Sequence, residues 1–428
     1  MENRIELCCD FLNTAHSPFH VAHGVAKQLE QAGYQRLFET DPWELVPGGK
    51  YYVMRGSSTV IAFRIPTVET PTGFMISASH SDHPTFQVKD DLTLSGRYSR
   101  LSVEKYGGMI ISSWLDRPLS LAGRVLVQTE DGIQEKLLDI DEDLLLIPNV
   151  AIHMNRQINE GYRWNPVTDI IPLIGGPEAA DKFKARLEEA AGGTILGHDL
   201  VLYIRQKPSV WGVDREYISA AALDDLACAF CCTEGFLEAE ESKAIPVLCI
   251  FDNEEVGSAS FQGAAGTLLR DVLKRILELR NLDWNRMATQ SFMVSADNGH
   301  AVHPNHPELA DAGNAPVVNG GVTLKFNSNR RYTTDGLSAA IFRSICAKAG
   351  VPVQNYYNRA DIPGGSTLGS VSQTHVTIPS VDIGLAQLAM HSCFETAGVK
   401  DVNYLCDAMK AYYSCALEVS NDGTYTLE

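Results

Sequence analysis

The sequence predicts an α/β fold in which a mostly parallel sheet flanked by helices is interrupted by an inserted β-rich domain. After residue 211, apolar segments of strand length alternate with helical segments, the pattern of a parallel sheet covered on both faces. Between 94 and 211 the segments instead alternate apolar and polar residues, as antiparallel strands do. A chain of 428 residues has room for both domains. We therefore predict a main domain over 1–93 and 212–428, and an inserted domain over 94–211.

The N-terminal part of the main domain is predicted to open with a helix and to continue as strands. Val21, Val25 and Leu29 recur at helical spacing, so a helix is expected from 11 to 38. Gly48-Gly49 ends this pattern. Three strand-like segments follow, at 51–55, 58–64 and 72–79.

The inserted segment is predicted to be a separate antiparallel unit. Its alternating stretches include 121–128 and 144–152. One helix is expected over 178–191, because Pro177 precedes it and two glycines follow it.

From residue 212 onward the chain alternates between the two kinds of element. Helices are expected over 224–239, 264–279, 335–349 and 402–419, and strands over 245–251, 291–297, 323–327, 351–357 and 381–385. In such sheets the chemistry gathers at the carboxyl ends of the strands. Asp82, Glu254, Glu255 and Asp297 each follow a predicted strand and are therefore candidates for a site.

Composition excludes several classes of partner. The chain has 35 basic and 53 acidic residues, a net charge of −18, which argues against nucleic acid and gives no polybasic membrane signal. No apolar run approaches membrane-spanning length, and the first residues lack the pattern of a secretory signal. Most of the ten cysteines lie in apolar segments, which favours reduced, buried thiols. We expect a soluble cytoplasmic enzyme with no membrane partner.

The stretch Phe251-Asp252-Asn253-Glu254-Glu255-Val256-Gly257-Ser258 is the most informative in the chain. Two adjacent carboxylates at the end of a buried strand repel each other and resist desolvation, and a bound cation would remove that cost. One glutamate could then be a metal ligand while the other acts as a general base, as metal-assisted hydrolysis requires. The alternative interpretation is that the strand simply ends in a polar turn.

Other candidates are individually weak. His80 and Asp82 lie two apart in extended backbone and face the same side, so the carboxylate could orient the imidazole, although on this pair alone a solvated turn is the better interpretation. Asp297 is placed as a ligand just beyond a buried strand, and His300 and His303 follow it as ligands, substrate contacts or loop residues.

Two more candidates have ordinary alternative explanations. His391 stands alone in an apolar setting that also suits a core histidine, and Asp224 opens a helix, where an N-terminal acidic residue is common. Together, however, these residues form the mixed nitrogen and oxygen set that suits Zn²⁺, Mn²⁺ or Co²⁺. A shared carboxylate would hold two such ions about 3.5–4 Å apart, as in hydrolytic two-metal sites.

The same motifs occur, in the same order, in a known peptidase family. The matching segments are His80-Ser81-Asp82, Leu223-Asp224, Asp252-Asn253-Glu254-Glu255-Val256-Gly257-Ser258, Ser295-Ala296-Asp297 with His300-Ala301-Val302-His303-Pro304-Asn305, and Gln387-Leu388-Ala389-Met390-His391-Ser392. The chain resembles the M18 metallopeptidases, the aspartyl aminopeptidase family. The resemblance covers essentially the whole chain, since Tyr106-Gly107-Gly108 and Leu121-Ala122-Gly123-Arg124-Val125 in the insert also look like family sequence.

The resemblance implies a two-metal site and assigns its ligands. His80 and Asp297 correspond to the terminal ligands of one ion, Glu255 and His391 to those of the other, and Asp224 to the bridging carboxylate. The ions implied are two divalent metals per subunit, most often zinc, with manganese or cobalt as alternatives.

The resemblance also implies a mechanism. Glu254 corresponds to the general base that takes a proton from a metal-activated water, and Asp82 to the carboxylate that orients His80. The expected reaction is removal of the N-terminal residue from peptide substrates.

The substrate pocket and the assembly are implied in the same way. Lys325 matches a family lysine that would attract an acidic Asp or Glu side chain, although it could instead pair with a carboxylate of the protein. Gly365 and Ser366 belong to a loop that resembles the pocket lining, and His303 matches a histidine that reaches into a neighbouring subunit. The family further implies that the insert is a dimerisation domain, and that dimers build a tetrahedral homododecamer.

Three hypotheses for the function therefore remain. An M18 aminopeptidase of acidic preference comes first. A two-metal aminopeptidase of neutral, leucine-type preference would share the ligands, but the related glutamyl and leucyl families lack the long insert with its Tyr-Gly-Gly motif. A non-catalytic self-assembling protein of the same fold would be expected to lack Glu254 or a ligand, and none is missing here.

Overall fold

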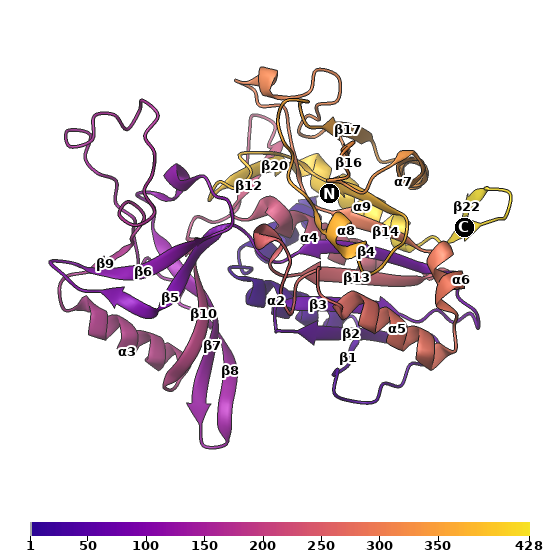
Figure 1. Cartoon of the computed structure of the whole chain (residues 1–428), viewed down its shortest axis with the longest axis horizontal. Coiled ribbons are helices and arrows are strands. Elements are labelled where there is room, and N and C mark those ends of the chain that lie inside the picture. Colours follow the sequence, from indigo (N-terminus) through magenta and orange to yellow (C-terminus); the bar gives the residue numbers. More distant parts are fainter. Residues whose placement is uncertain (1) are drawn as a thin grey trace.

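The main domain is built on a nine-stranded sheet (Figure 1). The computed structural model describes residues 2–428. Five of the eight strand pairings in this sheet are parallel, which confirms the predicted mostly parallel α/β fold. The strand order is β1 (Gln35–Arg36), β2 (Lys50–Arg55), β3 (Thr59–Arg64), β13 (Ile245–Phe251), β4 (Phe74–His80), β14 (Phe292–Ala296), β18 (Ser380–Gly384), β16 (Val322–Phe326) and β17 (Val353–Tyr357).

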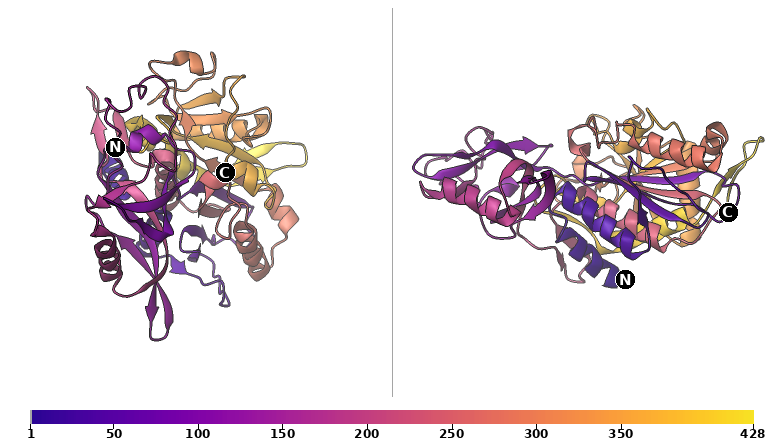
Figure 2. Two further views of the ribbon diagram at one scale, coloured as in Figure 1. Left: turned by 60° about the vertical axis from the view of Figure 1, so that its left-hand side comes forward. Right: turned by 90° about the horizontal axis from the view of Figure 1, so that it is seen from below.

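Helices cover both faces of this sheet (Figure 2). The hydrophobic core on one face takes in α1 (Glu2–Leu12), α2 (Pro18–Gln31), α4 (Leu223–Glu238), α7 (Gly336–Ala349) and α9 (Val399–Tyr413). The core on the other face takes in α5 (Leu268–Arg280), α6 (Trp284–Thr289) and α8 (Leu368–Ser372). The strands are buried on both sides, as the apolar composition of segments such as β13 requires.

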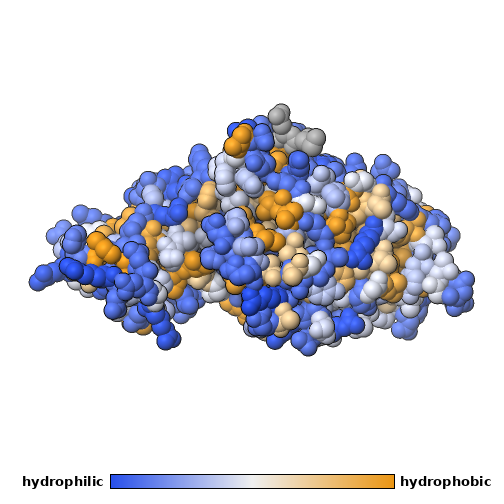
Figure 3. Space-filling model, turned by 90° about the horizontal axis from the view of Figure 1, so that it is seen from above, coloured by the Kyte–Doolittle hydropathy of each residue, from blue (hydrophilic) through white to orange (hydrophobic). Residues whose placement is uncertain are grey.

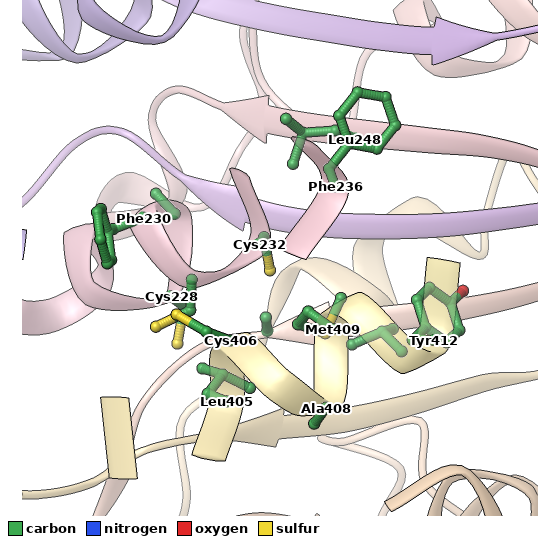
Figure 4. Packing of buried hydrophobic residues seen from close by; sticks show 14 of the residues in the cluster. Cys228, Phe230, Cys232, Phe236, Leu248, Leu405, Cys406, Ala408, Met409 and Tyr412 are labelled. Carbon is green, nitrogen blue, oxygen red and sulfur yellow. The ribbon is translucent and has the colours of Figure 1, made fainter. Parts of the chain in front are cut away.

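The two helices α4 and α9 pack closely at the centre of the first core. Figure 4 shows Cys228 and Cys232 of α4 beside Cys406 and Met409 of α9. Gly235 permits this approach, because a Cβ atom there would lie 2.5 Å from the Cβ of Met409. All ten cysteines are free thiols, nine of them buried, in agreement with the prediction from their apolar surroundings.

The inserted domain is a six-stranded antiparallel sheet with one helix against it (Figure 1, left). Its helix α3 (Ala179–Ala191) packs Phe183 and Leu187 into the core of this domain. The strand order is β8 (Gly132–Asp139), β7 (Leu119–Thr129), β10 (Ile195–Ile204), β5 (Thr85–Leu94), β6 (Ser99–Tyr106) and β9 (Leu173–Gly175). Strand β5 begins at Thr85 and pairs with β6 and β10, so it belongs to the sheet of the inserted domain. Residues 85–93 therefore lie in this sheet, although they were predicted to belong to the main domain.

A small third sheet lies beside the carboxyl ends of the central strands. Its order is β11 (Ser209–Trp211), β12 (Tyr217–Ala220), β20 (Glu395–Gly398), β19 (Ala386–Leu388) and β15 (Gly299–His300). A terminal hairpin of β21 (Leu417–Val419) and β22 (Tyr425–Leu427) ends the chain, and short 3₁₀ turns occur at Ile111–Trp114, Glu254–Val256 and Pro307–Leu309.

Three predicted elements are wrong in extent. The single helix expected from 11 to 38 is instead the end of α1 followed by α2, because Ser17 caps a new helix that begins at Pro18 and ends at Gln31. The helix expected over 402–419 ends at Tyr413, and the chain turns back through Asp422-Gly423 as a hairpin.

The strand expected over 144–152 is mostly loop. Leu145 and Leu146 make only isolated bridges, to Leu119 and Leu173, and Pro148 cannot donate to a ladder.

The outer surface is mixed in character. Hydrophilic residues dominate the face in Figure 3, with apolar residues scattered among them. Within residues 2–428, no helix combines the length and the apolar character that a membrane crossing needs.

Candidate metal centre

The predicted ligands come from five separate segments that meet at one edge of the central sheet. His80 ends β4, Glu255 lies in the 3₁₀ turn after β13, and Asp297 follows β14. Because β13, β4 and β14 are neighbouring parallel strands, their carboxyl ends lie side by side. Asp224 in the first turn of α4 and His391 in the turn after β19 complete the group.

Asp224 lies between the two histidines. Its Oδ1 is 3.8 Å from His80 Nε2, and its Oδ2 is 3.3 Å from His391 Nε2. His391 Nε2 is also 3.4 Å from Glu255 Oε1. The ligand atoms form two clusters that share Asp224, and within each cluster they lie within 4.8 Å of one another. This is the arrangement that two ions sharing one carboxylate require.

Asp225 belongs to the same cluster and was not assigned a role from the sequence. It lies with His80, Asp224 and Asp297, and its side chain is fully buried. Its Oδ2 accepts a hydrogen bond from the backbone N–H of His80 at 3.2 Å. Burial raises the pKa of Asp225 well above its ordinary value.

The unpaired oxygens of this cluster fit a cation. Among the described residues, Asp224 Oδ1, Asp225 Oδ1 and Glu255 Oε1 are buried and have no hydrogen-bond partner. Leaving a buried carboxylate oxygen without a donor is costly, and a bound metal ion removes that cost. Imidazole nitrogens with carboxylate oxygens are ligands suited to zinc, and to manganese or cobalt.

Comparison with known proteins identifies the family in which this chain and its cluster belong. The family model described as Aminopeptidase I zinc metalloprotease (M18) matches residues 11–413. The chain belongs to the M18 family. It is therefore a metallo-aminopeptidase of a family whose members are zinc peptidases, and the predicted resemblance is confirmed.

Relatives and solved M18 structures match along nearly the whole chain. A probable M18 family aminopeptidase 2 of Clostridium novyi is 39% identical, covering 97% of this chain and 100% of the relative. One of Ectopseudomonas mendocina is 37% identical, covering 96% and 98%. The cryo-EM structure of an Ape4 and Nbr1 complex matches with a TM-score of 0.93 at 33% identity, covering 96% of this chain and 86% of that one. The dodecamer of S. cerevisiae mApe1 matches with a TM-score of 0.84 at 26% identity, covering 95% of each chain.

In this M18 chain Asp82 lies behind His80. His80 Nδ1 is 3.0 Å from the backbone oxygen of Asp82 and 3.4 Å from its carboxylate, so Nε2 is left to face Asp224. Asp82 is fully buried and also accepts the backbone N–H groups of Glu254 and Glu255, at 3.0 and 3.1 Å. It therefore ties the turn after β13 to the end of β4.

The inserted domain reaches this carboxylate through Tyr106. The Tyr106 hydroxyl donates to Asp82 Oδ2 at 2.6 Å and accepts from Asn253 Nδ2 at 2.9 Å. Gly107, next in the chain, has φ +71°, and a Cβ there would lie 3.2 Å from the Cβ of Glu255. The Tyr-Gly-Gly motif is thus part of the site's supporting structure.

Glu254 lies beside the ligands but belongs to neither of the two clusters that share Asp224. One of its carboxylate oxygens groups with ligand atoms of His80 and Glu255, within 4.8 Å of one another. Burial, reinforced by the negative charges of Asp297 and Asp82, raises the pKa of Glu254 to about 8. A carboxylate with a raised proton affinity is suited to accept a proton during catalysis.

A cavity of about 490 Å³ opens beside the cluster, and several predicted pocket residues line it. Lys325, Gly365 and Ser366 are among them, together with Tyr332 and Tyr356. His303 does not line it. It lines a neighbouring cavity, of about 310 Å³, which shares His300, Tyr356 and Gly365 with the first.

Lys325 is buried and fully engaged within the chain. Its Nζ donates to the backbone oxygens of Asp297 and Asn298, at 2.8 and 3.1 Å, and lies 3.2 Å from Asp297 Oδ2. Burial alone would lower the pKa of Lys325, but the Asp297 carboxylate raises it above its ordinary value. The lysine therefore stays charged and forms an ion pair with Asp297, a predicted ligand. This is the pairing with a carboxylate of the protein that the sequence analysis gave as the alternative.

Sequence reasoning missed the residues that act on the ligands indirectly. Asp225 stood next to a recognised ligand, but adjacency alone did not separate it from an acidic helix start. Tyr106 was noted only as part of a family motif, because nothing local links it to Asp82 across the domains.

Proposed function

We propose that this protein removes N-terminal residues from peptides with two divalent metal ions, and that it prefers acidic residues. The observation that carries the proposal is the placement of Asp224, whose two oxygens face His80 and His391. One ion would be held by His80 and Asp297 and the other by Glu255 and His391. When bound, the ions would supply Lewis acidity and a water of lowered pKa.

The protein's own groups would move the proton. Glu254 takes a proton from the attacking water and returns it to the leaving amine. Asp82 fixes the orientation of His80 throughout. The substrate's N-terminal ammonium would bind among the carboxylates of the cavity, which explains why only the first residue is removed.

Acidic preference would come from Lys325, the one lysine or arginine among the described residues that line the cavity. A second candidate is a neutral, leucine-type preference. The contacts of Lys325 with Asp297 and Asn298 favour it, because they occupy the ammonium group that would otherwise bind an acidic substrate side chain. The two candidates share the metal centre and the role of Glu254.

Assembly and compartment complete the proposal. We propose a homododecamer built from dimers through the inserted domain, supported by the likeness to the mApe1 dodecamer. Ten free cysteines, nine of them buried, support a reducing, cytoplasmic location.

Metal-stripped protein tested on Asp, Glu, Leu and Lys aminoacyl substrates, with Zn²⁺, Mn²⁺ or Co²⁺ added back, separates these candidates. Restored activity confined to Asp and Glu would support both the metal centre and the acidic preference. Restored activity on Leu would keep the mechanism and discard the preference. No activity with any metal would overturn the proposed reaction.

A further inference from the structure

A buried carboxyl group behind the metal centre joins two of its ligands. Glu395, the first residue of β20, is 1% exposed. Its Oε2 accepts the backbone N–H of Asp224 at 2.9 Å, and its Oε1 accepts the backbone N–H of His391 at 2.6 Å. The N–H of Leu223 also points to this carboxyl group.

Glu395 has no cationic partner. Among the described residues, no lysine, arginine or histidine side chain forms an ion pair with it. Burying a carboxyl group in this way is costly unless backbone donors compensate, and here those donors are the ones that carry the ligands.

The two ligands tied by Glu395 lie in the turns that follow β12 and β19, the two strands that pair with β20 on either side. Asp224 opens α4, whose N-cap residue Ala222 offers no side-chain acceptor, so Glu395 takes that place. His391 lies in an irregular turn where φ is positive both there and at Ala389. Beyond the ends of these strand pairings, the Glu395 side chain fixes the helix start and the turn relative to each other. The Asp224 carboxylate and the His391 imidazole then meet at 3.3 Å on the opposite side.

We propose that Glu395 is a positioning residue for the metal centre, holding Asp224 and His391 at the spacing that a shared ion needs. The inference rests on the proposed two-metal site. It predicts that loss of the Glu395 contacts weakens metal binding rather than only the fold.

Asp401 provides a matched control. It too is a fully buried carboxyl group that accepts two backbone N–H groups, from Asn319 at 2.5 Å and from Gly321 at 2.8 Å. None of these residues belongs to the metal cluster. Glu395→Gln and Asp401→Asn each turn one acceptor oxygen into an amide group that opposes an N–H, so both should lower the melting temperature of the metal-free protein.

Zn²⁺ affinity, measured by competition with a chromophoric chelator, separates the two roles. E395Q should weaken at least one of the two binding steps by about 10–100-fold, the usual effect of losing a group that orients a ligand. D401N should bind Zn²⁺ as the wild type does. Excess Zn²⁺ should restore much of the kcat of E395Q. Equal Zn²⁺ affinity in E395Q, D401N and the wild type would overturn the proposal, whatever their melting temperatures.

Failure of this inference is distinguishable from failure of the proposed function. If the wild type binds two Zn²⁺ ions but hydrolyses no aminoacyl substrate, the reaction is wrong while the affinity test of Glu395 stands. If E395Q does not fold, Glu395→Asp serves instead, because the shorter side chain keeps a carboxyl group but cannot reach both N–H groups. Unchanged Zn²⁺ affinity in E395D would then overturn the proposal.

Discussion

The hydroxyl of Tyr106 donates a 2.6 Å hydrogen bond to the buried carboxylate of Asp82, joining the inserted domain to the main domain at the candidate metal centre. The backbone adds to this junction, since the Ile110 N–H donates to the oxygen of His391 at 2.9 Å. The position of the inserted domain is therefore coupled to both histidines of the cluster.

Tyr106→Phe should lower both stability and turnover. Removal of a hydrogen bond to a charged group typically costs about 1.5–3 kcal/mol, and Asp82 keeps only its backbone donors and His80. Urea unfolding and the kcat of the Zn²⁺-loaded protein measure the two effects. Tyr162→Phe is the control, because Tyr162 donates to Asp169 at 3.0 Å in the same domain and Asp169 belongs to no metal cluster. Equal results for the two variants would contradict the coupling.

Glu254→Gln should abolish most turnover and leave the metal content unchanged. Loss of a general base typically lowers kcat by about 10²–10⁴-fold, and the ligand clusters around Asp224 do not need Glu254. Metal analysis and kcat on the best substrate measure this. Glu278→Gln, on the exposed face of α5, controls for the change of charge. Unimpaired turnover in E254Q would remove Glu254 from its role.

A feature could be predicted from the sequence when the residues that determine it are close together in the chain, and not when they are far apart. The ligands could be found because polar residues at the ends of buried strands, such as Asp297 after β14, are unusual locally. Glu395 could not, since its contact with Asp224 joins residues 171 apart in the chain and involves only backbone N–H groups. No pattern of residue types marks such an acceptor.

The errors in the predicted elements have a similar cause. The apolar spacing of 402–419 suits a helix, but the segment 417–419 pairs with Tyr425–Leu427 instead. The long-range pairing overrides the local periodicity, whereas α3, bounded by Pro177 and two glycines, was predicted to within one residue at its start.

Removal of the metal ions should destabilise the protein reversibly. Without ions, Asp224, Asp225 and Glu255 keep buried oxygens without donors and repel one another. An ion at a hundred times its dissociation constant stabilises the folded state by about 2.7 kcal/mol per site. Melting temperature after chelation and after Zn²⁺ addition measures this, and Mg²⁺ should restore little because it prefers oxygen ligands. An unchanged melting temperature would contradict the site.

Acidic pH should destabilise the protein in part through His20. Burial lowers the pKa of His20 to about 4, and its Nδ1 lies 2.7 Å from the Ser17 hydroxyl at the start of α2. Because the folded state binds the proton less readily than the unfolded state, stability is full above the unfolded pKa and falls as pH drops from about 6.5 towards 4.

His20→Gln should remove this dependence. The difference in unfolding free energy between wild type and H20Q should shrink by up to about 1.4 kcal/mol for each pH unit below 6.5. Urea unfolding between pH 5 and 8 measures it. His153→Gln, at an exposed loop position, controls for the loss of one histidine. Parallel pH profiles for wild type and H20Q would exclude the effect.

Lys325→Ala decides between acidic and neutral preference. If Lys325 attracts the first side chain of the substrate, the ratio of kcat/KM for Asp over Leu substrates should fall by about 10–100-fold, the value of one charge-assisted hydrogen bond. Metal affinity should also fall, because Asp297 loses its 3.2 Å ion pair, so the ratio and not the absolute rate is the diagnostic quantity. Lys348→Ala, on the far end of α7, is the control. A variant that still prefers Asp would assign Lys325 to the support of Asp297 alone, and the specificity would then have to come from other residues of the cavity.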